Sequence, residues 1–187
     1  MSVPCFVAGT LIATPAGEVQ VELLRLGDLV NTKDHGPQPI RWVEFRHSTF
    51  GELTKTGQYP VEFKPGSLGL GRPRRRLRAS PQHRILVEGD SFAPARGLVG
   101  MSKVRSMTRC RWVRYHHILF SKHEVIYAEG VLTKSLLPGP TFLSGCRITD
   151  RLAIMRIADK SSESARALLS VSEDKRFVQQ RTSATFA

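Results

Sequence analysis

Hydrophobic and polar residues alternate in short stretches along the chain as far as Pro138. A period of two is typical of half-buried β-strands, and glycine or proline separates most of these stretches. Tight turns are predicted at Pro15-Ala16-Gly17 and at Ala128-Glu129-Gly130. The pattern predicts strands at 10–14, 18–22, 28–32, 39–48, 59–63, 83–89, 111–120, 124–130 and 131–137. Many short strands joined by such turns predict an all-β sandwich or a barrel-like body.

Two parts of the chain depart from this alternation. Residues 64–81 are rich in Gly, Pro and Arg, which predicts a loop with room for one turn of helix. Residues 149–160 and 161–177 have helical spacing, and Thr149 and Ser162 are candidate N-caps. The β body is therefore expected to carry a short helical tail.

Charge adds a second feature to this picture. The 187 residues hold 28 Lys and Arg against 16 Asp and Glu, a net charge of +12, and five arginines fall within residues 72–78. A basic cluster of this kind indicates either a solvated loop or a phosphate-binding surface. Aromatic residues make up only 7% of the chain, and none interleaves with the arginines to stack on a base. Nucleic-acid binding is therefore kept as an alternative, not as the leading interpretation.

Other classes are disfavoured. No apolar run approaches the roughly 18 residues that a membrane span needs, and the first residues lack the basic start of a secretory signal. Cys5, Cys110 and Cys146 are too few and too scattered for a disulfide framework or a metal knuckle. These features predict a cytoplasmic monomer with reduced thiols, without a metal ion or other cofactor.

Four features could carry chemistry. Cys5 stands directly before the first hairpin, and Ser80 and His83 stand three apart before a strand. His116, His117 and His123 follow one another near the end of the β region, where "VIYAEGVLTKS" predicts a strand, a turn and a second strand. Each has a structural alternative, because a lone Cys is usually a small packing residue and a His before a strand often fills a turn. His116 and His117 face opposite sides of a strand and cannot form a same-face metal pair.

Taken in order, these stretches resemble the Hint domain, the self-processing module of Hedgehog proteins and inteins. "CFVAGTLIATPAGEVQVELLRLGDLV" resembles its opening, with a first Cys, a Gly-Thr hairpin and a Gly-Asp pair. "SPQHRILV" resembles its Thr-x-x-His block, here with Ser80 in place of Thr. "HEVIYAEGVLT" resembles its closing block, which begins with a His, here His123. The resemblance implies a horseshoe-like, pseudo-two-fold Hint body at 5–139, a residual leader at 1–4 and a helical extension at 140–187.

The resemblance also implies a reaction. The Cys5 thiol would attack the carbonyl of Pro4, so that the Pro4–Cys5 amide becomes a thioester by an N-to-S acyl shift. His83 would donate a proton to the departing Cys5 nitrogen, and Ser80 would hold that amide by a hydrogen bond. The upstream polypeptide, acting in cis, would then be released or transferred to water or a small nucleophile. We expect His83 to lie near Cys5 as a partly exposed site residue, with His117 or His123 approaching the same cleft.

One departure limits the reaction. Inteins end in His-Asn, and Lys134 and Ser135 stand roughly at that place in this chain. Cleavage at the C-terminal side is therefore not expected, and any activity would be a single-turnover self-cleavage. The non-enzymatic alternatives are a Hint fold that has lost its chemistry and serves as a binding or structural module, and a basic nucleic-acid-binding protein.

Overall fold

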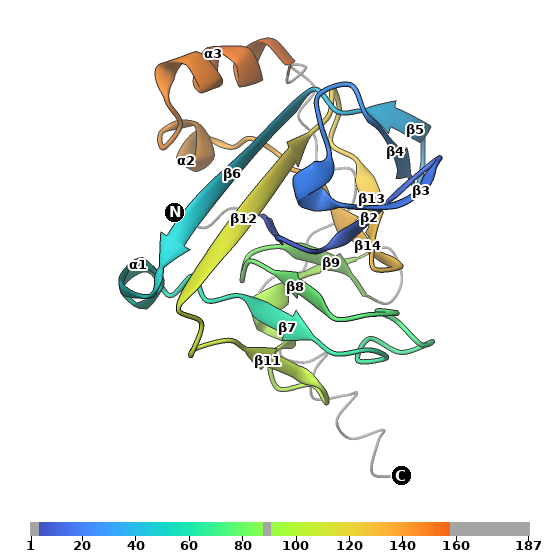
Figure 1. Ribbon diagram of the computed structural model, residues 1–187, viewed down its shortest axis with the longest axis vertical. Coiled ribbons are helices and arrows are strands. Elements are labelled where there is room, and N and C mark those ends of the chain that lie inside the picture. Colours follow the sequence, from blue (N-terminus) through green and yellow to red (C-terminus); the bar gives the residue numbers. More distant parts are fainter. Residues whose placement is uncertain (1–3, 88–90, 158–187) are drawn as a thin grey trace.

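The computed structural model describes residues 4–87 and 91–157 and shows two twisted antiparallel sheets (Figure 1). The first sheet contains, in spatial order, β11 (Val104–Ser106), β7 (Val61–Phe63), β8 (Leu77–Ala79), β1 (Phe6–Val7), β12 (Trp112–Leu119) and β6 (Trp42–Thr49). The second contains β10 (Phe92–Pro94), β9 (Arg84–Leu86), β14 (Val131–Lys134), β13 (Val125–Ala128), β2 (Leu11–Thr14) and β3 (Gly17–Gln20). Strand β4 (Leu29–Thr32) pairs with β13, and β5 (Gly36–Pro39) pairs with β4. The prediction of an all-β body is confirmed.

The helices are short and lie at the edges. They are α1 (Phe50–Thr56), α2 (Pro140–Leu143), α3 (Ile148–Ile157) and the 3-10 turns η1 (Val21–Leu23) and η2 (Ala95–Leu98). Within the described residues, no helix is long and apolar enough to cross a membrane. Helix α3 confirms the first predicted tail helix, whereas the second, at 161–177, lies outside the described residues.

The structure contains elements that the sequence did not predict, among them the short strands β1, β5, β10 and β11. The expected loop at 64–81 ends in β8, where Leu77 and Ala79 are buried on either side of Arg78. This alternation is too short to stand out among the arginines around it. Helix α1 was not predicted either, although a capping box of Thr49 and Glu52 starts it.

The two predicted turns are both present. Thr14 pairs with Gly17, so Pro15 and Ala16 form the loop of the first hairpin. In the second, Glu129 adopts a positive φ of 51°, which is uncommon for a residue with a side chain. Its carboxylate accepts a hydrogen bond from the Leu11 N–H at 2.9 Å, and its own N–H donates to the Leu11 carbonyl at 2.9 Å. These bonds hold the turn and join β13 to the start of β2.

The chain changes sheets directly after its first strand. β1 lies inside the first sheet between β8 and β12, and β2 already belongs to the second sheet. Only residues 8–10 separate them, and the Thr10 hydroxyl donates to the Val7 carbonyl at 2.7 Å within this crossing. Phe6 and Ile12, on either side of it, are buried in the same hydrophobic core. Cys5 is thereby fixed at the start of a central strand.

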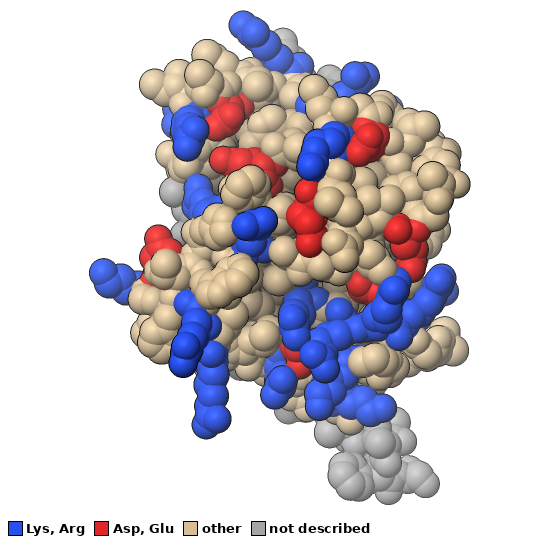
Figure 2. All heavy atoms as spheres, in the orientation of Figure 1, with Lys and Arg blue, Asp and Glu red and all other residues tan. Residues whose placement is uncertain are grey.

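The arginine-rich segment is organised around a buried carboxylate. Glu62 on β7 is fully buried, and its two oxygens accept hydrogen bonds from Arg78 and Arg105, each at 3.0 Å. Arg76 lies 3.5 Å from the same carboxylate. Burial opposes ionisation of Glu62, but the hydrogen bonds from Arg78 and Arg105 prevail and lower its pKa. Lys and Arg gather on the lower part of the molecule in Figure 2, and part of this cluster has an internal structural role.

We expect Glu62→Gln to lower the free energy of unfolding by about 2 kcal/mol, because it removes a buried charge that two guanidinium groups solvate. Arg78 and Arg105 are partly exposed and would be hydrated in the variant. The loss of stability is therefore smaller than for a fully buried ion pair. The measurement is urea denaturation followed by circular dichroism. Glu18→Gln is the control, because Glu18 pairs with Arg75 on the surface. This substitution should lower the free energy of unfolding by about 0.5 kcal/mol or less. Equal losses in the two variants would contradict this account.

Candidate active site

Cys5 lies buried between two strands that are far from it in sequence. Its neighbour Phe6 pairs with Ala79 on β8 and with His116 on β12. Since both pairings are antiparallel, one step back along β1 places Cys5 between Ser80 on one side and His117 on the other. The sheet register therefore assembles three candidate side chains in one row.

Ser80 holds the backbone of Cys5 from both directions. The Cys5 N–H donates to the Ser80 hydroxyl oxygen at 3.0 Å, and the Ser80 N–H donates to the Cys5 carbonyl at 3.0 Å. Ser80 is 2% exposed, so water does not compete for these bonds. The first bond involves the nitrogen of the Pro4–Cys5 peptide, the group on which the sequence analysis expected Ser80 to act.

His117 is the histidine that contacts the thiol. Its Nε2 lies 3.5 Å from Cys5 Sγ, and a hydrogen bond links the ring to the Pro4 backbone. Because proline has no N–H, the Pro4 group involved is its carbonyl. Burial lowers the pKa of His117 to about 4, with the Pro4 hydrogen bond opposing part of the shift. The imidazole is therefore neutral near pH 7 and able to accept a proton.

The Cys5 thiol is protonated in this environment. Burial raises its pKa far above the ordinary value, while a hydrogen bond with Ser80 and the charge of Arg46 lower it only in part. Arg46 lines a cavity of about 170 Å³ together with Cys5, Ser80, Tyr115 and His117. A buried thiol needs a local base to become a nucleophile, and His117 is in contact with it.

His83 is buried, not partly exposed as the sequence suggested. It is 1% exposed, and its ring packs on Phe6 with the centroids 4.3 Å apart. Burial, followed by the nearby His117, lowers its pKa to about 3. Neither ring nitrogen has a hydrogen-bond partner among the described residues. The structure thus places the His83 ring against Phe6, the residue next to Cys5.

His123, the remaining sequence candidate, lies beside the end of β14. Burial and the charge of Lys134 lower its pKa to about 4, and a hydrogen bond with the Ser135 backbone opposes this shift. The Ser135 hydroxyl accepts from the Glu124 N–H at 2.9 Å. His123 therefore belongs to the group at Lys134 and Ser135. His117, which the sequence analysis named only as an alternative to His123, makes the contact with Cys5.

Comparison with known proteins decides the family. A family model described as the Hint domain matches residues 4–140. The chain belongs to the Hint domain family. No curated protein sequence matches the chain. Membership of this family suggests a capacity for autoprocessing in general, and such a domain acts on its own polypeptide in cis.

Solved inteins have a similar fold. A variant of the Ssp DnaB mini-intein gives a TM-score of 0.52 at 10% identity, covering 73% of this chain and 97% of the intein. A substituted form of the gp41-1 intein gives a TM-score of 0.50 at 16% identity, covering 70% of this chain and 98% of the intein. At such identities the likeness shows the fold alone. It confirms the horseshoe-like Hint architecture expected from the sequence.

The buried histidines predict how the stability of this Hint domain depends on pH. His83, His117 and His123 have folded-state pKa values of about 3, 4 and 4, against about 6.5 in an unfolded chain. The unfolded state therefore binds more protons below pH 6.5. Stability should be fully present above about pH 6.5 and should fall as the pH drops through about 4.

Urea denaturation at several pH values measures this effect. His83→Gln should reduce the slope of unfolding free energy against pH between pH 6.5 and 4, because it removes one group that takes up a proton on unfolding. His47→Gln, at an exposed histidine, should keep the slope of the wild type. A stability that does not change over this interval would refute the assignment.

Proposed function

We propose that this Hint domain processes itself by an N-to-S acyl shift at the Pro4–Cys5 bond, followed by cleavage or transfer of the upstream segment. The observation that carries the proposal is the position of His117, which meets both the Cys5 thiol and the Pro4 backbone. Ser80 holds the other side of the same peptide through the Cys5 N–H. The nucleophile, the scissile carbonyl and the leaving nitrogen are therefore all engaged by protein groups.

In the first step the neutral His117 ring, in the tautomer with its proton on Nδ1, takes the thiol proton at Nε2 while Cys5 Sγ attacks the Pro4 carbonyl carbon. A C–S bond forms, and the carbonyl electron pair moves to oxygen. Attack within one residue needs no encounter of separate molecules, which compensates for the poor acidity of the buried thiol. The imidazolium that forms carries an N–H that can donate to the Pro4 oxygen as negative charge develops there.

In the second step the C–N bond breaks and the Cys5 nitrogen must gain a proton. His83 is the proposed donor, because its ring lies against Phe6 and has unused nitrogens. With a pKa of about 3, only about one His83 in ten thousand is protonated at pH 7. This small population makes the acyl shift slow at neutral pH.

The thioester is then open to water, a thiol or an amine. Cleavage at the C-terminal side is not part of the proposal, because Lys134 and Ser135 lack the amide side chain with which an intein Asn cyclises. Lys134 lies over the ring of Phe92, 4.7 Å from its centroid, and the Ser135 hydroxyl is occupied by the Glu124 N–H. These residues have local structural partners.

The direct test places a folded carrier protein upstream of Pro4 and follows intact mass with and without dithiothreitol. We expect release of the carrier at the Pro4–Cys5 bond, accelerated by the thiol, while the C-terminal tail stays attached. Cys5→Ala should abolish release. His117→Ala and His83→Gln should each slow it by about 10²–10⁴, the usual contribution of a positioned acid or base.

Cys110→Ala is the matched control. Cys110 packs against the hydrophobic cluster that includes Cys5, but its thiol donates to the Trp112 carbonyl at 2.9 Å and not to the Pro4–Cys5 peptide, so release should be unchanged. Glutamine at position 83 preserves polarity at a buried site, and a thermal melt of each variant separates loss of folding from loss of chemistry. Release that continues in the Cys5→Ala variant would refute the mechanism.

A second prediction concerns the pH dependence of the acyl shift under saturating hydroxylamine, which makes the shift rate-limiting. The protonated fraction of His83 grows about tenfold per pH unit as the pH falls towards its pKa of about 3. His117, with a pKa of about 4, remains mostly neutral above pH 6. The rate should therefore rise between pH 7.5 and 6. A rate that falls with decreasing pH would indicate attack by a pre-formed thiolate and would exclude His83 as the acid.

A further inference from the structure

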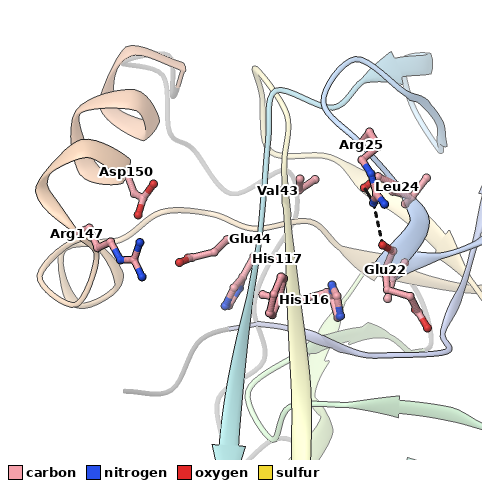
Figure 3. A pocket seen from close by; sticks show the side chains of 11 residues that line it. Glu22, Leu24, Arg25, Val43, Glu44, His116, His117, Arg147 and Asp150 are labelled. Atoms are coloured by element: carbon pink, nitrogen blue, oxygen red, sulfur yellow. Dashed lines mark hydrogen bonds between the residues drawn. The ribbon is translucent and has the colours of Figure 1, made fainter.

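A second cavity adjoins the candidate active site and shares one wall with it. It measures about 580 Å³, within the range of small-ligand sites, and His117 lines both this cavity and the smaller one at Cys5. His117 therefore borders both the larger cavity and the space beside the reacting sulfur. Figure 3 shows the residues that line this cavity.

The sheet register connects the two cavities through one row of residues. Glu44 on β6 pairs directly with His117 on β12, and His117 in turn contacts Cys5. Directly opposite residues of an antiparallel pair bring their side chains to the same face, about 5 Å apart at the Cβ atoms. Figure 3 shows Glu44 beside His117, with Asp150 and Arg147 of the α3 region on the same side of the two strands.

Two histidine nitrogens in this cavity have unused hydrogen-bonding capacity. His117 is 5% exposed and His116 is 7% exposed. Within the described part of the chain, nothing hydrogen-bonds to His117 Nδ1 or to His116 Nε2. Buried polar atoms without partners are uncommon in folded proteins. His117 Nδ1, on the ring that shares a face with Glu44, therefore has hydrogen-bonding capacity for a polar ligand in this cavity.

The charges in the cavity indicate the kind of ligand. Glu22 is already engaged by the Gly9 N–H, and Arg25 donates to the carbonyls of Glu22 and Leu24. What remains is the pair Glu44 and Asp150, with Arg147 beside them. Burial and the like charge of Asp150 raise the pKa of Glu44 even though Arg46 and Arg147 oppose the shift. A cation placed between the two carboxylates would relieve this repulsion.

We propose that this cavity is the acceptor site of the reaction, where Glu44 and Asp150 bind a primary ammonium group and direct the amine to the thioester on Cys5. The proposal rests on the self-processing function argued above. The ammonium could belong to the N-terminus of a polypeptide or to a lysine side chain, which share this chemistry. The upstream segment would then be transferred to the amine as a new amide.

The transfer balances without an oxidant or a further reactant. The bound ammonium gives one proton to the Glu44 carboxylate, and the free lone pair attacks the thioester carbonyl carbon. A C–N bond forms and the C–S bond breaks, with its electron pair returning to Cys5 Sγ. The second proton of the amine passes through His117 to the sulfur. The products are an amide, the Cys5 thiol and a protonated Glu44, which returns its proton to solvent.

The test uses the carrier fusion of the full chain at pH 7.5, with each nucleophile titrated and the products measured by intact mass. One arm uses a lysine-free peptide with a free N-terminus, and another an N-acetylated peptide with one lysine. Hydroxylamine, uncharged at this pH, is the comparison. With a fixed concentration of dithiothreitol present, we expect the ratio of amine adduct to dithiothreitol adduct to saturate with at least one of the two peptides and to rise linearly with hydroxylamine. The ratio is used because the acyl shift limits the rate of every adduct at high nucleophile concentration. The peptide for which the ratio saturates identifies the source of the amine.

Variants are compared by the partition between amine adduct and dithiothreitol adduct in one tube, because this ratio does not depend on the rate of thioester formation. The double variant Glu44→Gln, Asp150→Asn should lower the ratio about tenfold, the effect of losing about 1.4 kcal/mol of ammonium binding. Asp34→Asn is the matched control, at an exposed carboxylate in the β4–β5 turn, and should keep the wild-type ratio.

Linear dependence on both peptides in the wild type would overturn the acceptor site, and so would an unchanged partition in the double variant. Either result could be obtained while dithiothreitol still releases the carrier, in which case the self-processing function stands. Failure of dithiothreitol to release the carrier from the wild type would instead refute the function itself. The wild-type titration keeps the inference testable if the double variant does not fold.

Discussion

The pairing of β1 with β8 and β12 is the constraint on which the rest of this molecule depends. β1 has only two residues, yet it lies in the interior of a six-stranded sheet. The two hydrogen bonds between Cys5 and Ser80 extend this pairing by one residue beyond the strand. A shift of one residue would turn Cys5 to the other face of the sheet and separate it from His117. The proposed chemistry therefore depends on backbone register.

Strand pairing also explains how buried carboxylates are accommodated in the two sheets. Glu62 is satisfied by arginines from β8 and β11, and Glu129 by the backbone of β2 and by Arg75. His83 and His117 differ, because ring nitrogens remain without hydrogen bonds among the described residues. The two carboxylates are thus saturated, whereas His83 and His117 near the scissile peptide keep unused hydrogen-bonding capacity, as do the Ser67 and Thr133 hydroxyls elsewhere.

The sequence was informative where chemistry and turn geometry are local. The turn at Glu129-Gly130 is a short-range pattern and is found where it was expected. Cys5 before the hairpin and Ser80 three residues before His83 are short-range patterns of the same kind. The contact of His117 with Cys5 was harder to predict, since it depends on the pairing of β1 with a strand more than a hundred residues later. The association of Glu62 with Arg105 has the same origin. The burial of His83 could not be read from its loop-like surroundings either, because Phe6 covers it from another strand.

The bond between the Cys5 N–H and the Ser80 hydroxyl has a consequence for the direction of the proposed reaction. An amide nitrogen carries no charge, but once the acyl group moves to sulfur the same atom becomes a primary amine with a pKa near 8. At neutral pH it takes up a proton and, as an ammonium, can still donate to the same serine oxygen. A protonated amine has no lone pair with which to attack the thioester in reverse. Ser80 would then hold the Cys5 ammonium group in place, and the positive charge on that nitrogen would prevent the original peptide bond from re-forming.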